Sequence, residues 1–268
     1  MGFFGKLFEK KECAFCGGEI GLLGNRKLED GNMCKTCAKK LSVWFDDRRH
    51  STVEQIGKQL AYREENRAKV ASFRTTRSFG EYKKLLLDED AGTFMITLSD
   101  TADEMAEENP DVIAISDITS CTLDIDESHR ELMQRDKEGK SIPYVPARYE
   151  YTYNFEINIG VNNPYFNDMS FHLNRSSIEI VTQQPQLAKK LGMIGKVLSS
   201  IEPETSVEYR HYKTMGEELC DTLLKLRDGV REKKAAEAEP PKKVVCPYCN
   251  ATTTPDASGC CEFCGGTI

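Results

Sequence analysis

The sequence predicts an α+β protein of several domains, in which a mostly antiparallel β-sheet domain lies between two small cysteine-rich modules. Three observations support this prediction. Eight of the 11 cysteines fall into four Cys-x-x-Cys pairs, two near each end of the 268-residue chain. Between them, short apolar runs that partly alternate with polar residues indicate strands, and the apolar stripe of residues 209–231 indicates a helix that closes the sheet.

The two cysteine-rich modules have the ligand spacing of tetrahedral zinc sites. The N-terminal module covers residues 12–50, and the C-terminal zinc ribbon covers residues 245–268. Their candidate ligands are Cys13, Cys16, Cys34 and Cys37 in the first and Cys246, Cys249, Cys261 and Cys264 in the second. The segment CAFCGGEI that begins at Cys13 is repeated as CEFCGGTI from Cys261. Because neither group includes a histidine, we expect two closed, structural Zn²⁺ sites and no catalytic zinc.

Thioredoxin-type redox chemistry is the alternative for a Cys-x-x-Cys pair. That chemistry requires the Cys-x-x-Cys pair at the N-terminus of a helix after a βαβ start. The four pairs here instead form two sets of two pairs, one set near each end of the chain. Structural zinc is therefore favoured. Of the other cysteines, Cys121 and Cys220 lie on apolar faces and are expected to be buried. Cys260 is a spare thiol beside the ribbon; it offers an alternative to Cys261 as a ligand, although Cys261 preserves the spacing.

Residues 1–11 form a short amphipathic segment. Its apolar face carries Phe3, Phe4, Leu7 and Phe8. We expect this face to pack on the protein, and weak contact with a membrane surface is the alternative.

Residues 51–75 form a connecting helix. Ser51 and Glu54 have the spacing of a capping box, and the helix is expected to run from about Thr52 to Phe73. Trp44 and Phe45, just before it, are the expected hydrophobic seat of the N-terminal module.

Residues 76–231 form the β domain, with six or seven expected strands. These strands lie within residues 84–87, 93–98, 111–125, 148–161, 169–173 and 178–181. Residues 129–141 are expected as a polar loop, and residues 187–200 as a possible extra helix before the closing one. Residues 232–244, which are charged and end near two prolines, are expected as a flexible linker to the ribbon.

A β-meander closed by one amphipathic helix resembles the pleckstrin-homology and GRAM-like folds, on architecture alone. Members that bind phosphoinositides carry basic residues in the first hairpin loop, where this chain has Asp88, Glu89 and Asp90. Phosphoinositide binding is therefore disfavoured. These acidic residues, and those at 103–108, are expected as solvated loops. A protein-binding role needs only an exposed sheet edge or a groove beside the helix.

The N-terminal module resembles a bacterial family, the domain of unknown function 4428. The resemblance rests on Cys13 to Gly17, Gly21 to Leu23, Leu28 to Gly31, and Cys34 to Ser42. It covers about the first fifty residues, and it implies a zinc-binding module of cytoplasmic bacterial proteins without implying an activity.

The net charge and the motifs of the chain limit the classes of function that we expect. The net charge is −7, and neither cysteine module is strongly basic, so nucleic-acid binding is a minority hypothesis. The chain has no apolar run of the roughly 18 residues that span a membrane, and a cytoplasmic location is expected. His50, His129, His172 and His211 are scattered and belong to no nucleophile, base and orienter set, so we expect no enzyme. The leading hypothesis is a zinc-binding adaptor for unidentified protein partners.

Overall fold

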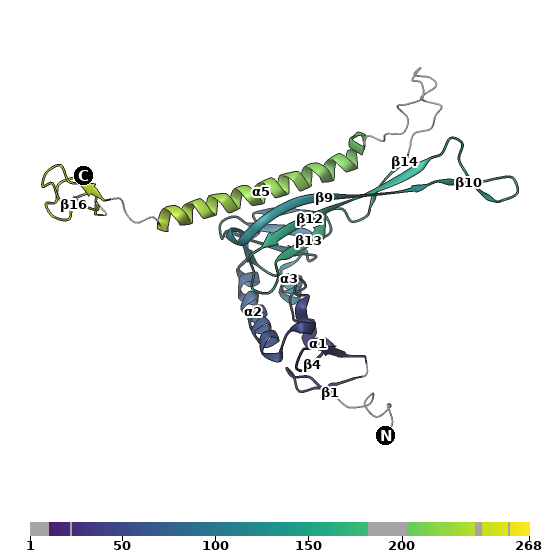
Figure 1. Ribbon diagram of the computed structural model, residues 1–268, viewed down its shortest axis with the longest axis horizontal. Helices are drawn as coiled ribbons and strands as arrows, with labels where there is room; N and C mark the ends of the chain where they lie inside the picture. Colours follow the sequence, from purple (N-terminus) through teal and green to yellow (C-terminus); the bar gives the residue numbers. More distant parts are fainter. Residues whose placement is uncertain (1–10, 22, 182–202, 239–242, 257) are drawn as a thin grey trace, which may run out of the picture. The chain divides into compact units, whose positions relative to one another are not determined.

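A computed structural model describes residues 11–21, 23–181, 203–238, 243–256 and 258–268. It combines helices with open antiparallel sheets (Figure 1). The chain divides into two compact units, residues 1–227 and 228–268, which are described separately below. The amphipathic segment expected at residues 1–11, except Lys11, and the extra helix expected at 187–200 lie outside the described residues.

The N-terminal module consists of two short hairpins and one turn of helix. Strand β1 (Lys11–Glu12) pairs with β2 (Glu19–Ile20), and β3 (Asn25–Lys27) pairs with β4 (Asn32–Cys34), which leads into α1 (Lys35–Ala38). A 3₁₀ turn, η2 (Asp47–His50), follows. The buried residues of the module are Cys13, Ile20, Leu28, Met33, Cys37, Leu41 and, from the next helix, Ile56. The module therefore has a small apolar core besides its cysteines.

Helix α2 (Val53–Ser72) confirms the expected connecting helix. Its capping box is formed by Thr52 and Gln55, not by Ser51 and Glu54, because Thr52 is the residue with extended backbone before the first helical turn. The buried face of α2 is partly polar, and it consists of Ile56, Gln59, Arg63, Asn66 and Val70. Such a face needs polar partners on the domain that it packs against.

The β domain contains two four-stranded antiparallel sheets. The first has the order β5 (Arg77–Phe79), β6 (Lys84–Asp88), β7 (Thr93–Thr97), β8 (Ile113–Ala114). Leu85, Leu87, Phe94 and Ile96 of its two central strands point into the main core, while Leu86 and Met95 pack with Val70 of α2 on the opposite face. Burial of both faces explains why β6 and β7 are continuous apolar runs.

The second sheet is built around β12 (Tyr149–Val161), the longest predicted strand. β9 (Ile118–Glu131) pairs with β12 along its whole length, and β13 (Asp168–His172) and β14 (Ile178–Val181) pair with successive parts of its other edge. Odd-numbered residues of β12 from Tyr153 to Val161 are buried, which confirms the alternation read from the sequence.

Several segments of the β domain differ from the sequence prediction, beginning with β5, which lies outside the expected strands. β9 continues to Glu131 and is followed by a hairpin of β10 (Met133–Arg135) and β11 (Ser141–Pro143), where a polar loop was expected. Cross-strand pairing with β12 and within this hairpin stabilises these strands, although their polar sequence does not predict strands. A short 3₁₀ turn, η3 (Ile115–Asp117), precedes β9.

The prediction of solvated acidic loops is confirmed for Glu89 and Asp90, which lie in an exposed turn, but it is wrong for Asp88 and for residues 102–108. Residues 102–108 form α3 (Ala102–Glu108), which begins with a capping box of Thr101 and Glu104. Asp88 is only 2% exposed. Its carboxylate accepts hydrogen bonds from the backbone N–H groups of Arg74 and Ala91, both at 2.9 Å, and so ties the β6–β7 turn to the end of α2.

Helix α5 (Val207–Ala238) follows the 3₁₀ turn η4 (Pro203–Thr205) and extends the predicted closing helix at both ends. Residues 232–238, expected as the first part of the flexible linker, are therefore helical. Its first part lies along the sheet of β9 and β12 (Figure 1). Leu219 and Leu223 are fully buried in the main core, and Gly216 permits close approach because a Cβ there would lie 2.7 Å from Leu123. Cys121 and Cys220 are buried between sheet and helix, as expected, with their sulfurs 3.0 Å apart.

The second unit contains the end of α5 and the C-terminal ribbon. In the ribbon, β15 (Val244–Val245) pairs with β16 (Thr252–Thr253), and isolated bridges join Pro255 to Cys261 and Cys260 to Thr267. Among the ribbon's described residues only Cys246, Cys261 and Thr253 are buried. The ribbon thus has almost no apolar core of its own.

Candidate metal centres

The eight cysteines of the Cys-x-x-Cys pairs gather into two groups of four. Within each group the sulfur atoms all lie within 4.8 Å of one another. The Sγ–Sγ distances are 3.8 Å for Cys16 and Cys34, 3.6 Å for Cys246 and Cys264, and 3.7 Å for Cys249 and Cys261. A tetrahedral ion with metal–sulfur bonds of about 2.3 Å separates its ligands by roughly 3.8 Å. Both groups therefore fit a metal ion of the size of Zn²⁺.

Three of the four pairs adopt the same turn. The N–H of the fifth residue donates to the carbonyl of the first cysteine: Gly17 to Cys13 at 2.9 Å, Asn250 to Cys246 at 2.9 Å, and Gly265 to Cys261 at 2.8 Å. These three donors have φ of 68°, 59° and 71°, the left-handed region that favours Gly and Asn. The residues that flank each turn are paired across a hairpin: Glu12 with Glu19, Val245 with Thr252, and Cys260 with Thr267. We call this arrangement the hairpin turn.

The fourth pair, Cys34 and Cys37, lies instead at the start of α1. Cys34 is the N-cap, and its sulfur accepts a hydrogen bond from the N–H of Cys37 at 3.3 Å. The N–H of Cys34 in turn donates to the sulfur of Cys13 at 3.3 Å. Backbone N–H groups thus surround the sulfurs and stabilise their anionic form.

The pKa values of the cysteines indicate why a group of four thiolates needs a cation to stabilise it. Burial raises the pKa of Cys13, but N–H groups of Cys34, Phe15 and Cys16 outweigh it and bring the value to about 6. Burial and the three neighbouring cysteines raise the pKa of Cys37 to about 12. Four thiolates so close together repel one another unless a cation lies between them.

Each group supplies four thiolates and leaves no ligand position for water or a substrate. Such a closed site holds loops together and performs no hydrolysis. Cys261 belongs to the C-terminal group of four and Cys260 does not, which agrees with the choice of Cys261 from the spacing. A third group that the sequence analysis did not find, Asp126, Glu156 and His172, lies on the outer face of the β12 sheet. Asp126 and His172 there are exposed.

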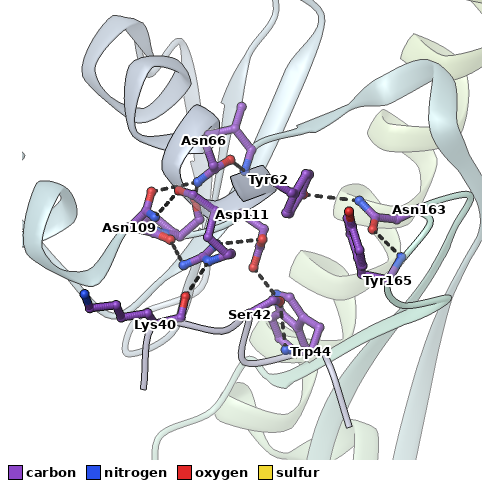
Figure 2. A network of polar contacts seen from close by, with 12 residues as sticks. Lys40, Ser42, Trp44, Tyr62, Asn66, Asn109, Asp111, Asn163 and Tyr165 are labelled. Atoms are coloured by element: carbon purple, nitrogen blue, oxygen red, sulfur yellow. Dashed lines mark hydrogen bonds and ion pairs between the residues drawn. The ribbon is translucent and has the colours of Figure 1, made fainter. Parts of the chain in front are cut away.

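The N-terminal module is fixed to the β domain by a buried polar network (Figure 2). Arg63 of α2 forms an ion pair with Asp111 at 2.6 Å, and the Ser42 hydroxyl donates to the same carboxylate at 2.7 Å. Asn66 donates to Asn109 at 2.9 Å and to the Pro110 carbonyl at 2.7 Å. Burial raises the pKa of Asp111, and the Arg63 guanidinium opposes that rise. The network satisfies Arg63 and Asn66 on the polar face of α2, whereas the buried side-chain amide of Gln59 on the same face has no hydrogen-bond partner among the described residues.

The expected hydrophobic seat divides between the two domains. Phe45 packs on the core of the N-terminal module, whereas Trp44 packs on the core of the β domain. Lys83 places its ammonium group 4.5 Å from the centre of the Trp44 ring. The sequence analysis did not predict the polar network of Arg63, Asn66 and Asp111. Asp111 lies 48 positions from Arg63, and no motif spacing links the two.

Each hairpin turn carries an aromatic residue just before its second cysteine, namely Phe15, Tyr248 and Phe263. Phe15 is half-buried against the core of the N-terminal module. Tyr248 is 71% exposed and Phe263 is 70% exposed. The same local structure thus presents a covered aromatic residue in one module and two uncovered ones in the other.

Comparison with known proteins bears on the N-terminal module. Residues 11–59 match the model of a family described as Domain of unknown function (DUF4428). This match covers the first four-cysteine group and the start of α2, as the resemblance in the sequence indicated. Searches of curated proteins and of solved structures give no match. Among the described residues, no helix combines the length and apolar character that crossing a membrane requires.

Proposed function

We propose that this chain is a non-enzymatic adaptor that binds two structural Zn²⁺ ions and contacts a partner protein through its C-terminal ribbon. In this proposal residues 76–231 form a body of the pleckstrin-homology type, and the ribbon is the contact module joined to it by a linker. Zinc is the metal that four-thiolate groups with this spacing and geometry favour.

The exposure of Tyr248 and Phe263 carries the proposal. Both are large aromatic side chains, exposed by 71% and 70%, in a ribbon with almost no core. Aromatic side chains are the residues on which binding energy at protein interfaces concentrates. Neither ring is buried in an apolar core of the ribbon, so both offer surface for contact with a partner.

An enzyme is not supported by the histidines. His50, His129, His172 and His211, which the sequence analysis assigned to no catalytic set, are all exposed. The sharper alternative for a zinc ribbon is nucleic-acid binding. Residues 243–268 contain one Lys against one Asp and one Glu, and the four thiolates add further negative charge, so phosphate contacts are not favoured.

Site-specific photocrosslinking in the organism that encodes the chain tests the proposal. A photoreactive phenylalanine analogue replaces Phe263 in one strain and Tyr82 in another. Tyr82 is the matched control because it is also an exposed aromatic residue, at 52%, and lies in the β domain. We expect a discrete protein adduct from position 263 and none from position 82. Adducts from neither position would contradict an adaptor role for the ribbon.

A further inference from the structure

The N-terminal module shows what the hairpin turn does when its aromatic residue is covered. Phe15 lies beside Gly57 and Leu60 of α2, which line a hollow of about 340 Å³ together with Cys16 and Cys37. Ile56 and Leu60 contribute to the same apolar cluster as Phe15. One face of a helix, with apolar residues four positions apart and a glycine between them, therefore covers this turn.

The covering helix also brings basic side chains to the hollow that Cys16 and Cys37 line. Arg63, Arg67 and Lys40 line the hollow together with Glu64. Arg63 is paired with Asp111 at 2.6 Å and Arg67 with Glu64 at 3.1 Å. Four thiolates around a divalent cation carry a net charge of −2, so basic side chains beside the sulfurs are electrostatically favourable. The seat for the helix thus combines an aromatic contact with basic side chains at the edge of the hollow.

The C-terminal ribbon has the same turn twice and no helix on it among its own described residues, 243–256 and 258–268. The ring of Tyr248 lies over Gly266, because a Cβ at that glycine would be 2.6 Å from its Cδ2. Tyr248 and Phe263 therefore belong to one compact group around a shared set of sulfurs. With one Lys, one Asp and one Glu in residues 243–268, the ribbon has a net charge of −1 before the cysteines are counted and −3 with a zinc-bound group.

We propose that the C-terminal ribbon binds a basic amphipathic helix of a partner protein, as the N-terminal module holds α2. The recognised face carries apolar residues at i and i+4, a small residue beside the first, and Arg or Lys one and two turns further on. This inference rests on the proposed adaptor function and specifies the chemistry of its partner. The occupant is a helix because α2 is what covers the same turn in this chain, and it is basic because the ribbon is acidic.

A peptide of residues 52–73 is the probe, since it contains this pattern at Ile56, Gly57, Leu60, Arg63 and Arg67. A staple between positions 61 and 65, both exposed on α2, keeps the free peptide helical. The labelled peptide is titrated into the zinc-loaded full chain and followed by fluorescence anisotropy. A second peptide with Arg63→Glu and Arg67→Glu tests the role of charge.

Binding with a dissociation constant in the micromolar range is expected, weakened at least about tenfold in the Tyr248→Ala, Phe263→Ala double variant. Tyr82→Ala is the matched control and should leave affinity unchanged. All variants should retain their zinc, which shows that the ribbon is still folded. The charge-reversed peptide should bind at least about tenfold more weakly.

Three results would overturn the inference: no saturable binding of the stapled peptide, binding that the double variant does not weaken, or binding of a labelled oligonucleotide in place of the peptide. The photocrosslinking experiment separates this inference from the proposed function. Protein adducts at position 263 without peptide binding would leave the adaptor role standing and refute the helical partner. Absence of both would refute the two together.

Discussion

The two cysteine modules of this chain contain the same hairpin turn in different surroundings. In the N-terminal module, Phe15 packs against an apolar core that includes Leu28, Met33 and Ile56. In the C-terminal ribbon, the equivalent Phe263 is 70% exposed, and hardly any apolar side chain is buried. A turn fixed by local hydrogen bonds can thus be packed against an apolar core or left exposed.

Metal removal should produce the largest difference between the two cysteine modules. The ribbon's fold depends on its metal site because it buries almost nothing else, so chelation should unfold it completely. The N-terminal module should loosen near its cysteines while the core around Leu28 and Met33 keeps part of its protection. Hydrogen–deuterium exchange with and without a strong chelator measures both regions in one sample.

The matched controls are Cys264→Ser and Cys16→Ser, each of which damages one site only. Zinc analysis should give two ions for the unaltered chain and one for each variant. A third equivalent of zinc would point to Asp126, Glu156 and His172. Equal loss of protection in both modules on chelation would contradict the difference drawn between them.

Breaking the buried network around Arg63 and Asp111 should have the next largest effect. It should destabilise the N-terminal module and leave the C-terminal ribbon unchanged. Arg63→Met leaves the Asp111 carboxylate buried without its partner, since the two side chains are 7% and 1% exposed. The loss expected for an orphaned buried charge is about 3–5 kcal/mol in the free energy of unfolding. Urea denaturation measures it.

Combining Arg63→Met with Asp111→Leu removes both charges and should restore most of that loss. Hydrogen exchange in the ribbon should stay unchanged in both variants. Equal stability of the single variant and the original chain would show that the network does not fix the module.

Truncating the equivalent aromatic residues compares the modules directly. Phe15→Ala removes a half-buried ring and should lower the free energy of unfolding by about 1–3 kcal/mol. Phe263→Ala removes an exposed ring and should change it by less than about 0.5 kcal/mol. Urea denaturation for Phe15→Ala, and hydrogen exchange of the ribbon for Phe263→Ala, give the two values. A large loss for Phe263→Ala would mean that its ring is structural.

Lowering the pH should produce the smallest difference between the two modules, which is a difference in the pH at which each releases zinc. Burial raises the pKa of Cys13 and of Cys246, yet backbone N–H donors bring the values to about 6 and about 7. A lowered cysteine pKa favours the thiolate that binds metal, and this contribution is lost as pH falls through the lowered value. The ribbon should therefore release zinc at a higher pH than the N-terminal module.

A chromogenic zinc indicator, used with Cys16→Ser and Cys264→Ser so that one site remains in each sample, measures the two release curves. The opposite order of release would show that the hydrogen bonds to Cys13 do not control proton competition.

Much of the local structure follows from short stretches of sequence. The cysteine spacing indicates both four-membered groups, the alternation of residues 149–161 indicates β12, and the apolar stripe after residue 209 indicates α5. These signals are local because a hairpin turn, a strand face and a helix face depend on neighbours a few residues apart. The assignment of residues 76–231 to a pleckstrin-homology type is a prediction that the fold comparison does not decide.

The elements that sequence reasoning missed depend on contacts with distant residues. Asp88 is buried because backbone N–H groups of Arg74 and Ala91 satisfy it, and β9 extends to Glu131 because β12 pairs with it. The Arg63–Asp111 pair joins residues 48 positions apart. No periodicity in the sequence reports such partners.

The sequence by itself determined which eight cysteines gather into two groups of four, because the spacing of each Cys-x-x-Cys pair is a local signal. Only the tertiary structure decided which turn is covered. Phe15 and Phe263 occupy the same position in nearly identical segments, and α2 packs beside one of them. The physical reason is that burial is a property of what packs against a side chain, and for a surface turn that neighbour lies elsewhere in the chain or in another molecule.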